Sequence, residues 1–207
     1  MSVKHEENVT NYNFKPKTNR DSYGWHDRGY LPHFDGPTQS QFITFRLYDS
    51  LPQSLLEKWT NEAASDAEFR KRIEAYLDAG YGECWLGQES IASLVQKALL
   101  FYHDKKYILI AWVIMLNHVH LLLQPKEGEH LPDIMHSIKS FTAQKANKLL
   151  GRTGRFWQRE SFDRYIRNEK HFLAVIRYIE ENPVKAGLCA IASEWRFSSA
   201  WGGRRVL

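Results

Sequence analysis

The chain has 207 residues, of which 43% are hydrophobic and 14% aromatic, enough for the core of one ordinary globular domain with an appendage. No run of about 18 apolar residues occurs, so we expect no membrane span, and the polar N-terminal stretch lacks the apolar core of a signal peptide. The two cysteines, Cys84 and Cys189, are not spaced like metal ligands. They suit a reducing, cytoplasmic environment better than a disulfide framework.

The net charge of +4 is unevenly distributed along the chain. Residues 139–177 contain ten Lys or Arg and three acids, so this block carries +7 and the remainder carries −3. Such a basic block points to a polyanionic partner. The simpler interpretation, a solvated basic face without a partner, stays open on charge alone.

The first half of the chain is expected to be mainly helical after a polar arm. Residues 1–40 are polar and contain three prolines, which predicts an extended arm. Residues 41–47 alternate as in a strand. Residues 51–80 are rich in helix formers and end at Gly80, and residues 90–103 repeat apolar positions at helical spacing.

The second half predicts two adjacent strands and then alternating helices and strands. Residues 107–115 are almost wholly apolar, and the short break before 118–125 predicts an antiparallel hairpin. A helix is predicted over 131–150, a mixed strand over 155–166, and a last helix over 168–182.

This order of elements predicts an α+β fold with an antiparallel sheet and helices on one face. The ferredoxin-like split βαβ layout is the nearest simple template. We therefore expect an arm over 1–40 and a single domain over 41–207, with a helical region at 51–103.

His118 and His120 are two residues apart on a predicted strand, so both imidazoles face the same side, about 6.5–7 Å apart along the chain. Two neutral imidazoles on one face can share a divalent metal ion, and Mg²⁺ would require an oxygen ligand in addition. Histidines in this pattern are more often structural. Their apolar surroundings favour a site, because polar rings inside a central strand must be satisfied.

Tyr178 lies on the flank of the apolar stripe of the last predicted helix, and Asn182 lies four residues later on the same flank. A phenol and a carboxamide placed this way offer a nucleophile and a metal-binding oxygen to one site. Each residue also has a purely structural interpretation. Tyr178 can extend along the helix edge with its hydroxyl in water, and Asn182 before Pro183 can be an N-cap followed by proline.

Together these motifs resemble the IS200-like transposases, and more closely the REP-associated tyrosine transposases. The resemblance rests on WVIMLNHVHLLLQP at 112–125, FWQRESFDRYIRNEKHF at 156–172 and RYIEENPVKAGL at 177–188. With supporting stretches near both ends, it extends over residues 28–200. The 51–80 segment is longer than in the smallest IS200 enzymes and looks like an inserted helical hairpin with an open role.

The resemblance implies a ferredoxin-like HUH endonuclease that cuts and rejoins single-stranded DNA at palindromic hairpins through a 5′-phosphotyrosine. It implies that His118, His120 and Asn182 bind a divalent metal, Mg²⁺ or Mn²⁺, and that Tyr178 is the nucleophile. It also implies a bacterial, nucleoid-associated protein acting as a monomer or homodimer. The side chains expected to contact DNA are Lys139, Arg155, Arg159, Arg164 and Arg167, together with Trp157 as a stacking platform or a core residue.

Two competing functions remain open. One is a DNA-binding protein that has lost catalysis or been domesticated, which the presence of all four site residues disfavours. The other is a hydrolase that uses the histidine pair on a small molecule. It would need a third strong ligand and a general base, and it leaves the basic block without a role.

Overall fold

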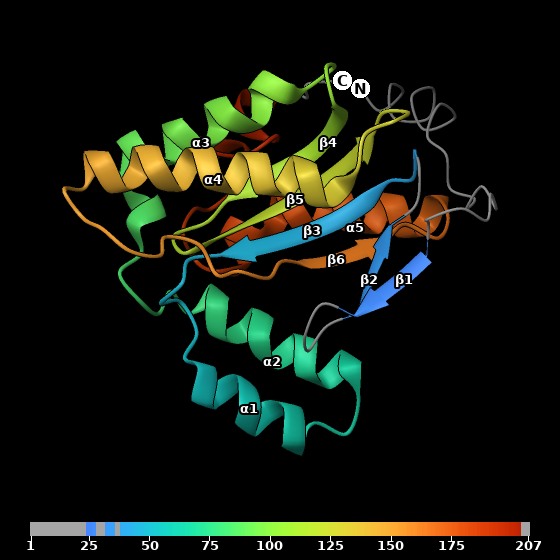
Figure 1. Cartoon of the computed structure of the whole chain (residues 1–207), viewed down its shortest axis with the longest axis horizontal. Helices are drawn as coiled ribbons and strands as arrows, with labels where there is room; N and C mark the ends of the chain where they lie inside the picture. Colours follow the sequence, from blue (N-terminus) through green and yellow to red (C-terminus); the bar gives the residue numbers. More distant parts are fainter. Residues whose placement is uncertain (1–23, 28–31, 36–37, 204–207) are drawn as a thin grey trace.

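The computed structural model describes residues 24–27, 32–35 and 38–203. At its centre is a four-stranded antiparallel sheet in the order β4-β5-β3-β6 (Figure 1). Within these described residues, no helix has the length and apolarity needed to cross a membrane. The strands are β3 (Gln41–Arg46), β4 (Tyr107–Ile114), β5 (His118–Pro125) and β6 (Phe162–Tyr165).

The predicted hairpin is present in the sheet. β4 and β5 pair directly, and β5 also pairs with β3, where Thr44 lies opposite His120 and Arg46 opposite His118. Since β5 has a neighbour on both sides and both of its faces are covered, its side chains are buried on both faces of the sheet. This burial accounts for its nearly continuous hydrophobicity.

Helices cover both faces of the sheet. α3 (Glu89–Tyr102) and α4 (Leu131–Leu149) pack on one face, and α5 (Glu169–Lys185) lies on the other (Figure 1). The expectation of helices on one face only was therefore wrong, because β4 and β5 are apolar on both sides and need two covering layers. Val119 and Leu121 belong to the α3–α4 core, whereas Leu122 belongs to the α5 core.

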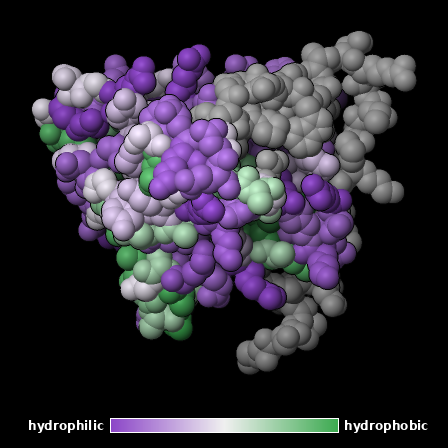
Figure 2. Space-filling view, turned by 90° about the horizontal axis from the view of Figure 1, so that it is seen from below, coloured by the Kyte–Doolittle hydropathy of each residue, from purple (hydrophilic) through white to green (hydrophobic). Residues whose placement is uncertain are grey.

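The predicted helical hairpin is present as α1 (Gln53–Glu62) and α2 (Asp66–Asp78), beside the sheet (Figure 1). Ser65 caps α2 by accepting a hydrogen bond from the Glu68 amide. A small separate core holds the hairpin in place, formed by Leu51, Leu56 and Phe69 with Phe162 of β6 packed against it. Seen from this side, the surface is largely hydrophilic (Figure 2).

Two predicted boundaries were wrong. Of the strand predicted over 155–166, only β6 forms regular strand, and Trp157 makes a single antiparallel bridge to Leu47. Pro183 does not end the last helix but lies inside α5, which continues to Lys185. Proline inside a helix removes one backbone hydrogen bond, and the burial of Pro183 offsets part of that cost.

Most of the predicted arm lies outside the described residues. Its described parts, β1 (Gly24–Asp27) and β2 (Pro32–Asp35), pair as a two-stranded antiparallel sheet, and β2 lies near β6. Three short 3₁₀ turns complete the described chain, η2 (Trp85–Gly87), η3 (Ala192–Glu194) and η4 (Trp201–Gly203).

Candidate metal and nucleophile site

The two histidines of β5 converge beneath α5. Alternation along the strand directs His118 and His120 to the α5 face, and each is 1% exposed. Their Nε2 atoms are 3.1 Å apart. Two ligands at neighbouring positions of an octahedral ion with bonds of about 2.1 Å are about 3.0 Å apart. The pair therefore has the spacing of two adjacent ligands of one cation.

Neighbouring polar groups orient both rings from behind. Asn117 donates its amide hydrogen to the Tyr81 carbonyl at 2.8 Å, which leaves its Oδ1 to accept from His118 Nδ1 at 2.7 Å. His118 Nε2 then carries a lone pair. On the adjacent strand, Thr44 Oγ1 lies 2.7 Å from His120 Nδ1. Such hydrogen bonds to the outer nitrogen are typical of metal-ligating histidines.

Burial keeps both imidazoles neutral. Burial lowers the pKa of His118 to about 3, and the Lys185 ammonium adds to the effect. The pKa of His120 lies well below its usual value, again mainly through burial, followed by the effects of His118 and Lys185. Neutral imidazole is the form that binds a metal.

This burial predicts a pH dependence of stability for the metal-free protein. The unfolded histidines bind protons below about pH 6.5 while the folded pair resists them, so the free energy of unfolding should fall from pH 6.5 toward pH 3. A fully titrating group contributes about 1.4 kcal/mol per pH unit. Urea denaturation in EDTA should give a shallower profile for His118→Gln than for the wild type, while His136→Gln, at an exposed position, keeps the steep profile. If the wild type and His118→Gln lost stability equally with falling pH, burial of a neutral His118 would not be the cause of the pH dependence.

α5 brings Tyr178 and Asn182 to the same place. The Tyr178 ring lies 5.3 Å from the His120 ring and 5.8 Å from the Phe42 ring, measured between centroids. Asn182, one turn later, is fully buried, and neither of its amide atoms has a hydrogen-bonding partner. The structure thus places Tyr178 beside the histidine pair and Asn182 next to the Tyr178 side chain on the same flank of α5. Because Asn182 lies inside α5, it is not an N-cap before Pro183.

The inserted hairpin also faces this site, which the sequence did not reveal. Asp78 Oδ1 lies 3.9 Å from His118 Nε2, and Asp78 Oδ2 pairs with Lys185 Nζ at 2.8 Å. One turn earlier, Glu74 lies beside the Tyr178 hydroxyl. The i, i+4 spacing of these two acids on α2 was visible in the sequence, but not which element they face.

These surroundings keep the Tyr178 phenol protonated in the metal-free site. Burial raises the pKa of Tyr178, and the charges of Glu74 and Asp78 raise it further. Burial also raises the pKa of Glu74 itself. A phenol in this environment needs a nearby positive charge before it can act as a nucleophile.

A comparison with known protein families covers the part of the chain that contains these residues. The family model described as IS200-like transposase matches residues 87–182, a segment that contains both histidines, Tyr178 and Asn182. Residues 87–182 are therefore similar to the IS200-like transposases. The α1–α2 hairpin lies outside the matched segment.

Two similar proteins extend the comparison. A protein described as a putative REP-associated tyrosine transposase, from Haemophilus influenzae, is 30% identical over 100 residues, which cover 44% of this chain and 57% of the relative. The match therefore spans little more than half of that relative. A solved structure of a REP-associated tyrosine transposase bound to a REP hairpin shares the fold, with a TM-score of 0.51 and 20% identity over 84% of this chain and 81% of the other.

The histidine pair does not form a complete metal site with acidic or sulfur ligands alone. Across the described ranges, no three His, Cys, Asp or Glu side chains are grouped closely enough to hold a metal ion. A metal at the histidines would therefore need the amide oxygen of Asn182 or a further oxygen ligand.

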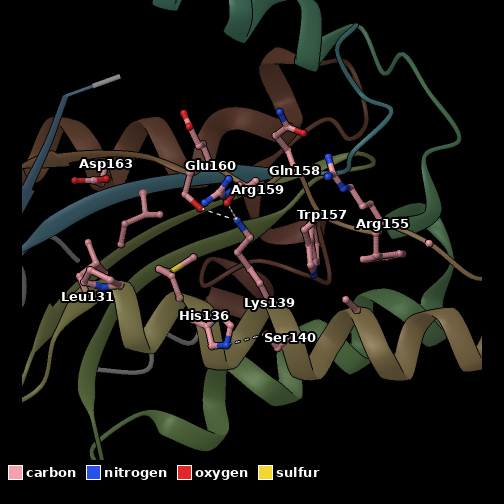
Figure 3. Close-up of a pocket in the computed structure, with 17 residues that line it drawn as sticks. Leu131, His136, Lys139, Ser140, Arg155, Trp157, Gln158, Arg159, Glu160 and Asp163 are labelled. Atoms are coloured by element: carbon pink, nitrogen blue, oxygen red, sulfur yellow. Dashed lines mark hydrogen bonds between the residues drawn. The ribbon is translucent and has the colours of Figure 1, made fainter. Parts of the chain in front are cut away.

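Four of the six predicted DNA-binding residues lie on the α4 side of the sheet. Lys139, Arg155, Trp157 and Arg159 line a cavity of about 680 Å³ between α4 and residues 154–161 (Figure 3). Lys139 Nζ donates to the Arg159 carbonyl at 2.8 Å and lies 3.2 Å from Ser161 Oγ. Burial lowers the pKa of Lys139 to about 8, with a contribution from Arg46. Lys139 thus fixes the loop to α4, whereas Arg155 and Arg159 are exposed.

Trp157 is a core residue rather than a stacking platform. It is 6% exposed, its ring packs against Phe45 at 4.8 Å, and its Nε1 donates to Thr142 Oγ1 at 2.9 Å. Little of the ring is left to stack on a base, so of the two alternatives the structure supports the core residue.

Arg164 and Arg167 lie near the inserted hairpin instead. Burial lowers the pKa of Arg164, followed by the positive charges of Arg167 and Arg70, which places Arg70 of α2 in the same basic cluster. We call Arg70, Arg164 and Arg167 the β6 basic cluster. Arg70 also lies 5.7 Å above the Phe162 ring. The sequence did not single out Arg70, because it lies outside the basic block.

Proposed function

We propose that this protein is a metal-dependent single-stranded DNA endonuclease and strand transferase that acts as a transposase at palindromic hairpin DNA. The observation that carries the proposal is the convergence of the two His Nε2 atoms, the Tyr178 ring and the unpaired Asn182 amide at one buried place between β5 and α5. A nucleophile beside a cation site is the arrangement that phosphoryl transfer to a side chain requires.

The residues present fit a divalent cation, Mg²⁺ or Mn²⁺. The imidazole nitrogens of His118 and His120 are separated like adjacent ligands, and Asn182 offers a buried oxygen that has no other partner. A buried amide without a partner is costly, which a bound cation would relieve. When bound, the cation would polarise a non-bridging phosphate oxygen and stabilise the charge that develops during displacement.

Tyr178 would perform the covalent step. Its phenolate oxygen attacks the scissile phosphorus, the bond from phosphorus to the 3′ oxygen breaks, and the 3′ oxygen leaves as a hydroxyl after gaining a proton. The DNA 5′ end is then held as a phosphotyrosine. Attack by a 3′-hydroxyl on this phosphotyrosine reverses the bond changes and rejoins a strand. The phosphodiester energy is conserved, so the cycle needs no ATP.

The proposed partner is DNA with a hairpin and a single-stranded flank. The structural relative is described as bound to a REP hairpin, and the basic residues of this chain supply suitable phosphate contacts. Arg155 and Arg159 at the α4 cavity and the β6 basic cluster near α5 are the proposed contacts. The four charges of Arg155, Arg159, Arg164 and Arg167 all fall within the block at 139–177.

The competing function is a DNA-binding protein without catalytic activity. It predicts hairpin binding without a covalent product at any metal concentration. Incubation with labelled hairpin DNA and Mn²⁺, followed by a denaturing gel, separates the two. We expect a metal-dependent protein–DNA adduct. Tight binding without an adduct would support the inactive DNA-binding protein.

The β6 basic cluster predicts a specific salt dependence of DNA binding. Log affinity should fall linearly with log salt at about 0.7 to 0.9 per phosphate contacted, so about four to six contacts give a slope of about −3 to −5. Replacing both Arg164 and Arg167 by alanine should flatten this slope by about one to two units. Fluorescence anisotropy with a flanked hairpin, from about 50 to 300 mM salt, measures the slope.

A matched double variant controls for the loss of net charge. Lys145 and Lys148 are both exposed on α4, on the sheet face opposite the histidines. Lys145→Ala with Lys148→Ala removes the same charge and should leave the slope nearly unchanged. Equal slopes for the two double variants would show that the β6 basic cluster makes no specific phosphate contacts.

A further inference from the structure

The α1–α2 hairpin lies outside the matched transposase segment, yet α2 reaches the histidine pair. Asp78, at the end of α2, places its Oδ1 3.9 Å from His118 Nε2. That oxygen is buried and has no hydrogen-bonding partner, whereas Oδ2 is held by Lys185. An acid with one satisfied and one free oxygen, the free one 3.9 Å from the Nε2 atom of His118, is placed to bind a cation.

Further unpaired atoms meet the same space. Asn182 is fully buried, and the Tyr178 hydroxyl is buried beside Glu74 and Asn182 without a well-aligned hydrogen bond to either. Two helices therefore direct unsatisfied polar atoms toward the histidine pair, α2 with Asp78 and α5 with Tyr178 and Asn182. Unsatisfied buried polar groups are rare in folded proteins, and a bound ion can account for such a cluster.

We propose that Asp78, carried by the inserted hairpin, is a carboxylate ligand of the same divalent cation as His118 and His120. The inference rests on the proposed function, to which it adds a ligand that lies outside the matched transposase segment. It also gives the hairpin a role: α2 covers the site and completes its oxygen ligands.

The distance is consistent with this role. Adjacent ligands of an octahedral ion with bonds of about 2.1 Å are about 3.0 Å apart, and opposite ligands are about 4.2 Å apart. The 3.9 Å between Asp78 Oδ1 and His118 Nε2 lies between these limits. Among the described residues no three His, Cys, Asp or Glu side chains form a closed group of ligands, so the Asp78 side chain would have to move closer to the histidines to bind the ion.

The rival interpretation is that Asp78 serves only to anchor Lys185. The Asp78–Lys185 ion pair joins the end of α2 to the end of α5. If that were its whole role, removing either partner would have the same effect on the site. If Asp78 is a ligand, removing Lys185 should instead preserve or strengthen cation binding, because a nearby positive charge is lost while the carboxylate remains.

The test measures Mn²⁺ binding to the whole protein without DNA. Binding is detected as the loss of the electron paramagnetic resonance signal of free Mn²⁺. We expect Asp78→Asn to weaken Mn²⁺ binding by at least about 10- to 100-fold, the loss typical even of residues that only hydrogen-bond to a metal ligand. Lys185→Met should bind as tightly as the wild type or more tightly. Glu57→Gln, which removes an exposed acid of the same hairpin, should bind as the wild type. Circular dichroism checks that each variant is folded.

The outcomes separate this inference from the proposed function. If His118→Ala loses Mn²⁺ binding while Asp78→Asn binds like the wild type, Asp78 is not a ligand and the histidine site stands. Equal weakening by Asp78→Asn and Lys185→Met would favour the ion-pair interpretation and overturn the proposal. Absence of Mn²⁺ binding by the wild type would overturn the metal site as a whole.

Discussion

Tyr178→Phe is expected to abolish the covalent protein–DNA product while hairpin affinity stays at the wild-type level. The substitution removes the only atom proposed to attack phosphorus and preserves the ring that packs on Phe42 and His120. Because the buried Tyr178 hydroxyl forms no well-aligned hydrogen bond with its neighbours Glu74 and Asn182, its loss should change the stability by no more than about 1 kcal/mol. A denaturing gel with labelled hairpin DNA and Mn²⁺ measures the product, and anisotropy measures the affinity.

Tyr165→Phe is the matched control for this experiment. Tyr165 belongs to β6, beside Arg167, whose guanidinium lies 5.9 Å from the Tyr165 ring centroid. Its hydroxyl has no place in the proposed reaction, so Tyr165→Phe should form the adduct as the wild type does. An adduct that persists in Tyr178→Phe but disappears in Tyr165→Phe would move the nucleophile to β6.

His118→Ala and His120→Ala should each abolish cleavage and leave hairpin affinity within about a few-fold of the wild type. Most nucleic-acid affinity comes from phosphate contacts, and both histidines are buried, unlike the exposed Arg155 and Arg159. Cleavage rates across a Mn²⁺ titration, with anisotropy alongside, test this. Cleavage at the wild-type rate by either variant would make the histidines structural residues.

His136→Ala provides the matched control for the histidine variants. His136 is exposed on α4, and its Nε2 lies 3.5 Å from Ser140 Oγ. It borders the α4 cavity and not the histidine pair. His136→Ala should cleave at the wild-type rate, which separates loss of the metal site from a general effect of removing an imidazole.

The sequence predicted the parts of the site that lie on regular elements. Alternation along β5 placed His118 and His120 on one face, and helical periodicity placed Tyr178 and Asn182 on one flank. These rules depend only on local geometry, so they hold once the element type is known. That Tyr178 and the histidine pair face each other came from the family resemblance, because no local rule predicts which sheet face a helix covers.

The remaining parts could not be predicted because they depend on tertiary contacts. Pro183 was expected to end α5, but its burial keeps it inside the helix. Trp157 lies in an irregular segment whose position is set by a bridge to Leu47 and a hydrogen bond to Thr142. The role of α2 was hidden for a similar reason: its acidic residues look like ordinary helix-surface residues until the packing of the hairpin places Asp78 beside His118.

The central claim, that Tyr178 carries the DNA, is tested most directly by identifying the residue in the covalent adduct. The adduct formed with hairpin DNA and Mn²⁺ is digested with nuclease and trypsin, and the peptides are sequenced by mass spectrometry. Cleavage after Arg177 and Lys185 isolates the peptide YIEENPVK, whereas Tyr165 falls in the separate peptide YIR. We predict a nucleotide joined through its 5′-phosphate to Tyr178. A nucleotide on Tyr165, or no nucleotide on any tyrosine, would contradict this claim.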